Sequence, residues 1–149
     1  GGPMGLSPTL MSQIRKSMYD VNNHRRGTAY RSRIVAENLK VAGKTGTSQV
    51  RSVVVRNEDV PWEERDHALF VGFAPYHDPK VACAVVVEHG GGGSRAAAPV
   101  ARDILARALH DDLPPLDIFP ASQRGELEAL FSSMPLLRDG EEPPSSDRA

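Results

Sequence analysis

Two short apolar runs separated by a turn constrain the fold of this chain more than any other feature. Residues 68–74 (Ala-Leu-Phe-Val-Gly-Phe-Ala) end at Pro75, and a valine-rich run at residues 81–87 follows after the polar stretch Tyr76-His77-Asp78-Pro79. Runs of this length bounded by turn residues are typical of buried strands. Because the connection between them is so short, we expect an antiparallel hairpin.

A third strand is expected over residues 38–50, which contain the sequence Gly43-Lys44-Thr45-Gly46-Thr47-Ser48. Side chains alternate between the two faces of a strand, so residues 44, 46 and 48 share one face and residues 45, 47 and 49 share the other. Residues 51–65 then form a polar excursion with the only tryptophan, Trp62. Within it, residues 53–55 are a candidate short extension of the strand.

Helical patterns flank the three strands. Ser7 is placed to cap a helix that has Pro8 in its first turn and ends near residues 22–23. The apolar residues of this helix recur at helical spacing and are expected to form a buried face: Leu10, Ile14, Met18 and Val21. After Gly90–Gly93, we expect Ser94 to cap a second helix with Pro99 in its first turns and an apolar stripe formed by Val100, Ile104, Leu105, Ala108 and Leu109.

Beyond residue 112 the composition changes. Proline pairs at residues 114–115 and 143–144 flank one weak helical stretch at residues 122–131. We therefore divide the chain into a folded portion at residues 1–112 and a Pro-rich, partly disordered tail at residues 113–149, which we expect to be either surface-lying or disordered. The expected fold class is α/β, of the α+β type: a helix, three antiparallel strands, a helix and the tail.

Composition argues against nucleic-acid binding, against an intrachain disulfide and against a membrane-spanning helix in this chain. The chain has 149 residues with 18 basic and 19 acidic side chains, a net charge of −1, so no strong field favours binding to nucleic acid. The single cysteine, Cys83, excludes an intrachain disulfide and is expected to be a small buried thiol. No apolar run reaches the roughly 18 residues of a membrane helix. The chain begins Gly-Gly-Pro, and we expect no signal peptide within these residues.

Local motifs for phosphate or metal binding are incomplete. A phosphate-binding loop at Gly43-Lys44-Thr45 would require a glycine at position 38, which is Asn38, and a helix after the lysine. Gly90–Gly93 before a helix could cradle an anion, although a plain strand-to-helix turn also explains it. The arginines at residues 25–26 are expected to be solvated. No metal site and no cofactor are expected, because metal-ligand spacing is missing at His67, His77, Glu88 and His89.

The lysine and threonines of the third strand suit the binding of a carboxylate. Lys44 offers an ammonium group, Thr45 and Thr47 offer hydroxyl donors, and backbone N–H groups at a strand edge can stabilise a developing oxyanion. Lys-Thr-Gly is also the last of three signatures shared by serine β-lactamases and penicillin-binding proteins. Alone, the triplet fits equally well a solvent-exposed strand edge with no role.

Further segments occur in a fixed order around Lys-Thr-Gly. They are Gly27-Thr28-Ala29, Ala42–Val50, Asn57–Trp62, Asp66–Pro75, Val86–Ser94 and Ala98–Ala101. This series, within residues 6–120, resembles the C-terminal part of the transpeptidase domain of the elongation-type, class B penicillin-binding proteins (penicillin-binding protein 2), and is most similar to alphaproteobacterial members. The order of helix, strands and helix fits the last part of that β-lactamase/transpeptidase-like fold.

The resemblance implies a peptidoglycan D,D-transpeptidase at the periplasmic face of the bacterial inner membrane, which crosslinks stem peptides through a serine acyl-enzyme and is acylated by β-lactams. It also implies the elongation glycosyltransferase and its scaffold as partners. By the same resemblance, Thr45 and Thr47 bind the carboxylate of the D-Ala-D-Ala end or of the drug, next to Gly46. The backbone N–H of Thr47 forms half of the oxyanion hole, and Lys44 sets the electrostatics of the cleft.

The sequence departs from the family in one respect that bears on activity. No serine is followed three positions later by lysine, and no Ser-x-Asn occurs; Ser12-Gln13-Ile14-Arg15 has arginine at the key position. The nucleophilic serine, its base and the second motif are therefore absent from this chain, as are the family's membrane anchor and pedestal. We expect a fragment that is inactive alone. The alternatives are a non-enzymatic penicillin-recognising sensor and, less favoured, a serine β-lactamase.

Overall fold

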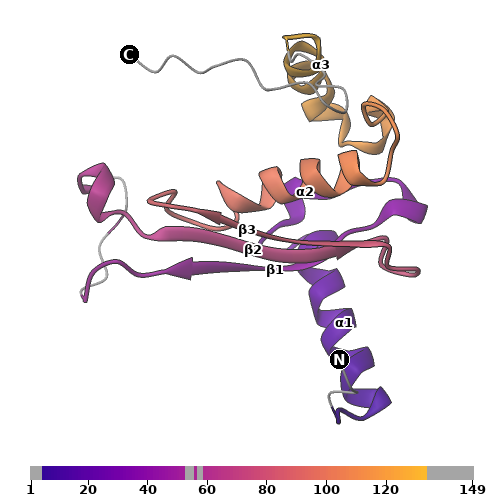
Figure 1. The fold of residues 1–149 in the computed structure, drawn as a ribbon, viewed down its shortest axis with the longest axis horizontal. Coiled ribbons are helices and arrows are strands. Elements are labelled where there is room, and N and C mark those ends of the chain that lie inside the picture. The colour runs from indigo at the N-terminus through magenta and orange to yellow at the C-terminus, as the bar shows by residue number, and fades with distance from the viewer. Residues whose placement is uncertain (1–4, 53–55, 57–58, 134–149) are drawn as a thin grey trace, which may run out of the picture.

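The computed structural model describes residues 5–52, 56 and 59–133. Its sheet has three antiparallel strands in the spatial order β1 (Ala42–Ser48), β2 (His67–Ala74) and β3 (Val81–Val87). Helix α1 (Pro8–Asn23) precedes the sheet, and α2 (Ala97–Ala108) and α3 (Arg124–Ser133) follow it. In Figure 1, α2 lies along one face of the sheet, α1 extends from the other side, and α3 lies beyond α2. The predicted class, with its three antiparallel strands, is confirmed.

The core lies between the sheet and α2. On β2, Ala68, Phe70 and Ala74 are at most 1% exposed and alternate with more exposed residues, as a strand with one covered face requires. Ala101 and Leu105 of α2 are equally buried and belong to the same apolar cluster. The hairpin of β2 and β3 is therefore fixed to α2, and β1 is added at its side.

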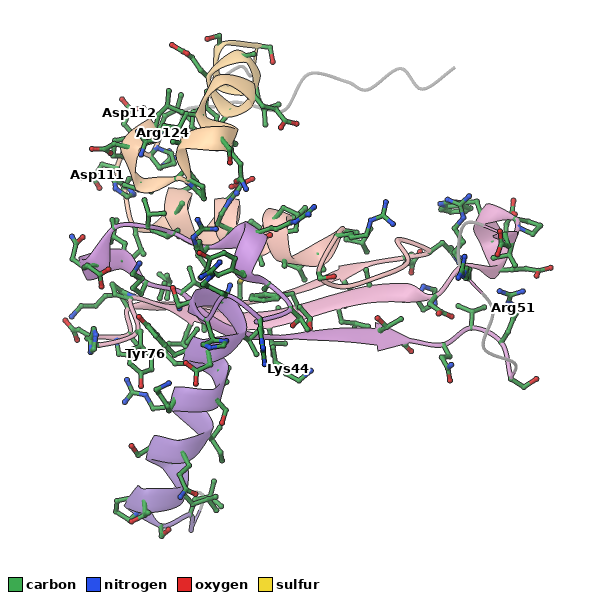
Figure 2. The ribbon with its side chains drawn as sticks, turned by 180° about the vertical axis from the view of Figure 1, so that it is seen from behind. Lys44, Arg51, Tyr76, Asp111, Asp112 and Arg124 are labelled. Atoms are coloured by element: carbon green, nitrogen blue, oxygen red, sulfur yellow. The ribbon has the colours of Figure 1, made fainter. Side chains whose placement is uncertain are left out.

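Strand β1 is shorter than the expected range of residues 38–50. Asn38 lies in a single 3₁₀ turn (Glu37–Leu39), and the strand begins only at Ala42. At the far end, Arg51 Nη1 lies 3.2 Å from Glu64 Oε2 and joins the two ends of the polar excursion; Figure 2 shows Arg51 well away from Lys44 and α1. The predicted extension at residues 53–55 lies outside the described residues.

Helix α1 begins as predicted, with Ser7 Oγ accepting a hydrogen bond from the Leu10 N–H at 3.2 Å. The predicted buried face is wrong for Leu10 and Ile14, which are 41% and 40% exposed. From Arg15 onwards α1 packs against the sheet region: Arg15 Nη2 donates to the Tyr76 carbonyl at 2.6 Å, and Asn23 Nδ2 donates to the Val41 carbonyl at 2.8 Å. The N-terminal turns extend away from the sheet (Figure 1), so no described element covers their apolar side.

The N-terminus of α2 differs from the expectation that Ser94 caps it. Ala96 occupies the N-cap position and makes no side-chain hydrogen bond. The Ala96 and Ala97 N–H groups instead donate to the carbonyls of Gly92 and Gly93, at 3.1 and 3.2 Å. The flexible glycine run can fold its own carbonyls back onto the helix, and the serine hydroxyl is not needed there.

Part of the stretch predicted to be a surface tail is packed into the core. Ile118 and Phe119 are 5% and 0% exposed, and Leu127 of α3 is 5% exposed. Phe119 also meets Phe131 with ring centroids 6.3 Å apart. The surface-lying interpretation is therefore wrong for these residues, although a division at residue 112 stays a prediction and residues 134–149 lie outside the described part. Among the described residues, no helix is long and apolar enough to cross a membrane.

Candidate functional site

Strand β1 forms one edge of the described sheet and carries the predicted site residues. Its register pairs Lys44 with Val71, Thr45 with Phe70, Gly46 with Leu69 and Thr47 with Ala68. Cross-strand partners share a face of the sheet. The two threonines therefore lie on the face of the buried residues Phe70 and Ala68, and Lys44 lies on the opposite face. This agrees with the alternation expected from the sequence.

Two hydrogen bonds meet at Thr45. Its hydroxyl oxygen lies 2.8 Å from the hydroxyl oxygen of Thr28, a residue 17 positions earlier in the chain. Its carbonyl accepts a hydrogen bond from Lys44 Nζ at 2.6 Å, while the Lys44 side chain stays exposed beside α1 (Figure 2). A positive charge and two hydroxyls thus surround one residue, an arrangement that suits an anionic ligand.

The connection that carries Thr28 is firmly attached to α1. Gly27 N–H donates to the His24 carbonyl at 2.8 Å, and Ala29 N–H donates to the Val21 carbonyl at 3.0 Å. A Cβ at position 27 would overlap the carbonyl oxygens of Asp20 and Val21, so only glycine fits this approach. The close contact fixes the path of the backbone immediately before Thr28.

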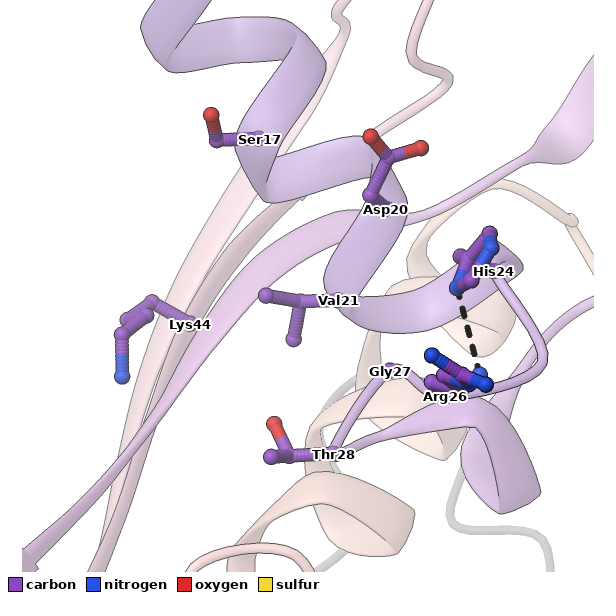
Figure 3. A pocket seen from close by; sticks show the side chains of 8 residues that line it. All are labelled: Ser17, Asp20, Val21, His24, Arg26, Gly27, Thr28 and Lys44. Carbon is purple, nitrogen blue, oxygen red and sulfur yellow. Dashed lines mark hydrogen bonds between the residues drawn. The ribbon is translucent and has the colours of Figure 1, made fainter.

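A hollow of about 400 Å³ opens beside these groups (Figure 3). Its walls come from the C-terminal half of α1, the following connection and β1: Ser17, Asp20, Val21, His24, Arg26, Gly27, Thr28 and Lys44. Within the wall, the Arg26 backbone N–H donates to His24 Nδ1 at 3.2 Å. Sequence reasoning placed Lys44 here but gave no role to Ser17, Asp20 or Thr28, because no short motif links a helix and a loop to a later strand.

Close glycine contacts hold β1 in place. A Cβ at Gly43 would overlap the Phe70 ring and would lie 2.7 Å from the Val71 carbonyl oxygen. Gly93, from the glycine run before α2, is seated on the backbone of Gly46 and Leu69, where a Cβ would overlap both carbonyl oxygens. The glycine run therefore packs against the strand pair that carries Lys-Thr-Gly-Thr.

His67 and His89 contact each other and connect the start of β2 to the segment that follows β3. The His89 N–H donates to His67 Nδ1 at 3.0 Å, and the ring centroids lie 4.8 Å apart, next to Trp62. In the described part of the chain, no three His, Cys, Asp or Glu side chains are grouped to hold a metal ion. Cys83 lies on β3, distant in the sheet order from β1, and burial raises the pKa of its thiol.

The family model of the penicillin binding protein transpeptidase domain matches residues 4–106. The chain therefore belongs to the penicillin-binding protein transpeptidase family, as the ordered segments predict.

Within this family, the chain is similar to peptidoglycan D,D-transpeptidases named MrdA. The peptidoglycan D,D-transpeptidase MrdA of Haemophilus influenzae is 37% identical over 119 residues, which are 76% of this chain and 18% of that protein. MrdA of Salmonella typhimurium is 40% identical over 96 residues, 62% of this chain and 15% of that protein. The chain thus spans less than a fifth of the length of these relatives.

Solved structures agree with this assignment. PBP2 of Pseudomonas aeruginosa is similar with a TM-score of 0.54 and 35% identity, over 78% of this chain and 22% of that one. PBP2 of Helicobacter pylori, solved in a complex with MreC, has a TM-score of 0.53 and 36% identity, over 65% of this chain and 17% of that one.

Proposed function

We propose that this chain is the part of an elongation-type peptidoglycan D,D-transpeptidase that forms the Lys-Thr-Gly-Thr wall of its active site. The observation that carries the proposal is the edge position of β1, where Thr45 contacts both Thr28 and Lys44, two residues that line one hollow. The family match and the MrdA relatives support the same reaction. The substrate is a peptidoglycan stem peptide, and β-lactams acylate the complete enzyme as substrate analogues.

Each site residue has a distinct role in this proposal. The hydroxyls of Thr45 and Thr47 bind the carboxylate of the acyl donor, and Gly46 leaves space at the wall. Backbone groups of residues two apart in a strand point to the same side, so the Thr47 N–H shares the side on which the Thr45 carbonyl meets Lys44. There it donates to the developing oxyanion. Lys44 supplies positive charge near the carboxylate.

The nucleophilic serine and its lysine base are not in this chain, so the wall binds but does not attack. We therefore expect the 149-residue chain alone to remain unlabelled by a fluorescent penicillin. Covalent labelling of this chain would show that a serine within it is the nucleophile, and would overturn the assignment.

The roles of the threonines are tested in the full-length protein by the second-order rate constant for penicillin acylation. A hydrogen bond to a charged group contributes about 1.5–3 kcal/mol, so Thr45→Val and Thr47→Val should each lower the constant roughly 10- to 150-fold. Ser48→Ala, at the exposed end of β1, is the matched control and should change it less than about twofold. Full-length protein that binds penicillin reversibly, without acylation, would favour the sensor alternative.

Partners and location belong to the same proposal. The complex of Helicobacter pylori PBP2 with MreC supports a scaffold protein as a partner. By family resemblance, the elongation glycosyltransferase is a second partner, and the site faces the periplasm at the inner membrane. Co-purification with the full-length protein tests both partners. A full-length protein that retains neither the scaffold protein nor the glycosyltransferase would contradict this part of the proposal.

A further inference from the structure

We propose that Thr28 is a positioning residue for Thr45: its hydroxyl donates a hydrogen bond to the Thr45 hydroxyl and so directs the Thr45 hydrogen towards the carboxylate of the acyl donor. The inference rests on the function proposed above, and it adds a residue outside the Lys-Thr-Gly-Thr strand to the recognition of that carboxylate.

The first step is the contact itself. The two hydroxyl oxygens lie 2.8 Å apart, which is the usual length of a hydroxyl-to-hydroxyl hydrogen bond. Thr28 also lines the hollow beside β1 (Figure 3), so the hydrogen bond joins a residue of the wall of this hollow to the strand that carries Lys-Thr-Gly-Thr. Thr45 is half-buried and Thr28 is exposed, which places Thr28 at the rim.

The second step is the rigidity of the backbone that presents Thr28. The residue before it, Gly27, is packed against the end of α1 without space for a side chain. The residue after it, Ala29, is 1% exposed, and its N–H donates to Val21 at 3.0 Å. Thr28 is therefore fixed on both sides, and its hydroxyl has a defined place relative to β1.

The third step is a count of hydrogens. Each threonine hydroxyl has one hydrogen and two lone pairs, so only one hydrogen lies between Thr28 and Thr45. A carboxylate only accepts hydrogen bonds, so Thr45 must donate to it. Thr28 must then be the donor within the pair, and this chain of two hydrogen bonds polarises the Thr45 hydroxyl. Without Thr28, the Thr45 hydroxyl hydrogen is free to rotate towards water.

The test compares penicillin acylation by full-length wild-type protein, Thr28→Val and Thr28→Ser, each with the free acid and with the methyl ester of the same penicillin. Valine has the shape of threonine without the hydroxyl, and serine retains the hydroxyl. Thr28→Val should weaken acylation by the free acid about threefold to tenfold, the range of one neutral hydrogen bond, through weaker binding at an unchanged chemical step. It should leave the ester unaffected, and Thr28→Ser should behave like wild type.

The acid-to-ester ratio is measured within each variant, so a partly unfolded preparation lowers both rates and leaves the ratio unchanged. Thr9→Val, an exposed threonine on α1, is the matched control and should keep the wild-type ratio. In a Thr45→Val background, Thr28→Val should have no further effect. A wild-type acid-to-ester ratio in Thr28→Val would overturn the inference about Thr28. The proposed function would still stand if Thr45→Val strongly lowers acylation by the free acid. Failure of the wild-type protein to be acylated would overturn the proposed function itself.

Discussion

The contact of the glycine run with the site strand gives the sharpest test of the fold. Gly93 is seated on the carbonyl oxygens of Leu69 and Gly46, at the pairing of β1 with β2, and an added Cβ would also lie 3.0 Å from the Gly46 nitrogen. The next residue before it, Gly92, has no atom within 4 Å of the same added carbon. Neither glycine has a positive φ. The two positions therefore differ in the space around them, and neither has the positive φ that would disfavour alanine.

We expect Gly93→Ala to destabilise the protein strongly and Gly92→Ala to be nearly neutral. Both substitutions restrict the unfolded chain equally, a gain of about 0.4–1 kcal/mol that cancels in the comparison. Overpacking of a filled site costs typically about 1–3 kcal/mol. The atoms in the way at Gly93 are backbone carbonyls of two paired strands, which cannot rotate aside, so the cost should approach the upper end, about 3 kcal/mol.

Urea unfolding followed by circular dichroism measures the difference. With a slope of about 1–3 kcal/mol per molar urea, a loss of about 3 kcal/mol lowers the midpoint of Gly93→Ala by roughly 1–3 M relative to Gly92→Ala. Equal midpoints for the two variants would show that the glycine run does not pack on β1, and the account of how the site strand is held would be refuted.

Two further predictions concern other parts of the molecule. Phe119→Ala should lower the free energy of unfolding by about 3–5 kcal/mol, because Phe119 is fully buried. Leu130→Ala should lower it by about 1 kcal/mol or less, because Leu130 is 46% exposed. Similar urea midpoints for the two variants would contradict the burial of Phe119. Burial disfavours the Cys83 thiolate and raises its pKa, so iodoacetamide should alkylate the native protein more slowly than the urea-unfolded protein at pH 8, by mass spectrometry. Equal alkylation rates of the native and unfolded protein would contradict the raised pKa of the Cys83 thiol. The same raised pKa means that the stability of the folded protein falls as the pH rises past the ordinary thiol pKa of 9.0.

The strands, and the faces of the sheet on which the side chains of β1 lie, were predictable because their signals are local. The hairpin is encoded by two apolar runs with a short polar connection, and the observed pairing of Ala74 with Val81 closes it at that connection. Alternation along Lys44–Thr47 was enough to assign the side chains to faces, since a strand has a period of two.

What failed depends on contacts that a local pattern does not contain. The spacing of Leu10 and Ile14 shows that they share a face of a helix, but not that another element covers this face. The prolines around residues 114–120 suggested a surface tail, yet they bracket Ile118 and Phe119, and a proline-rich connection can place two apolar side chains in a core as well as a regular element can. The Thr28–Thr45 bond spans 17 residues and leaves no periodic trace in the sequence.

Taken together, these contacts explain how an edge strand can act as a precise wall. An edge strand has a partner on one side only, and its free side is prone to twist or fray. Here β1 is held at Gly43 by the Phe70 ring and the Val71 carbonyl, at Gly46 by Gly93, and at Thr45 by Thr28. The three contacts fall at residues 43, 45 and 46, immediately before and within the Lys-Thr-Gly-Thr stretch, and the outer edge of β1 has no strand partner among the described residues. Hydrogen-bond donors fixed in this way need little reorganisation when a carboxylate or an oxyanion arrives, which is the condition under which they contribute most to binding and catalysis.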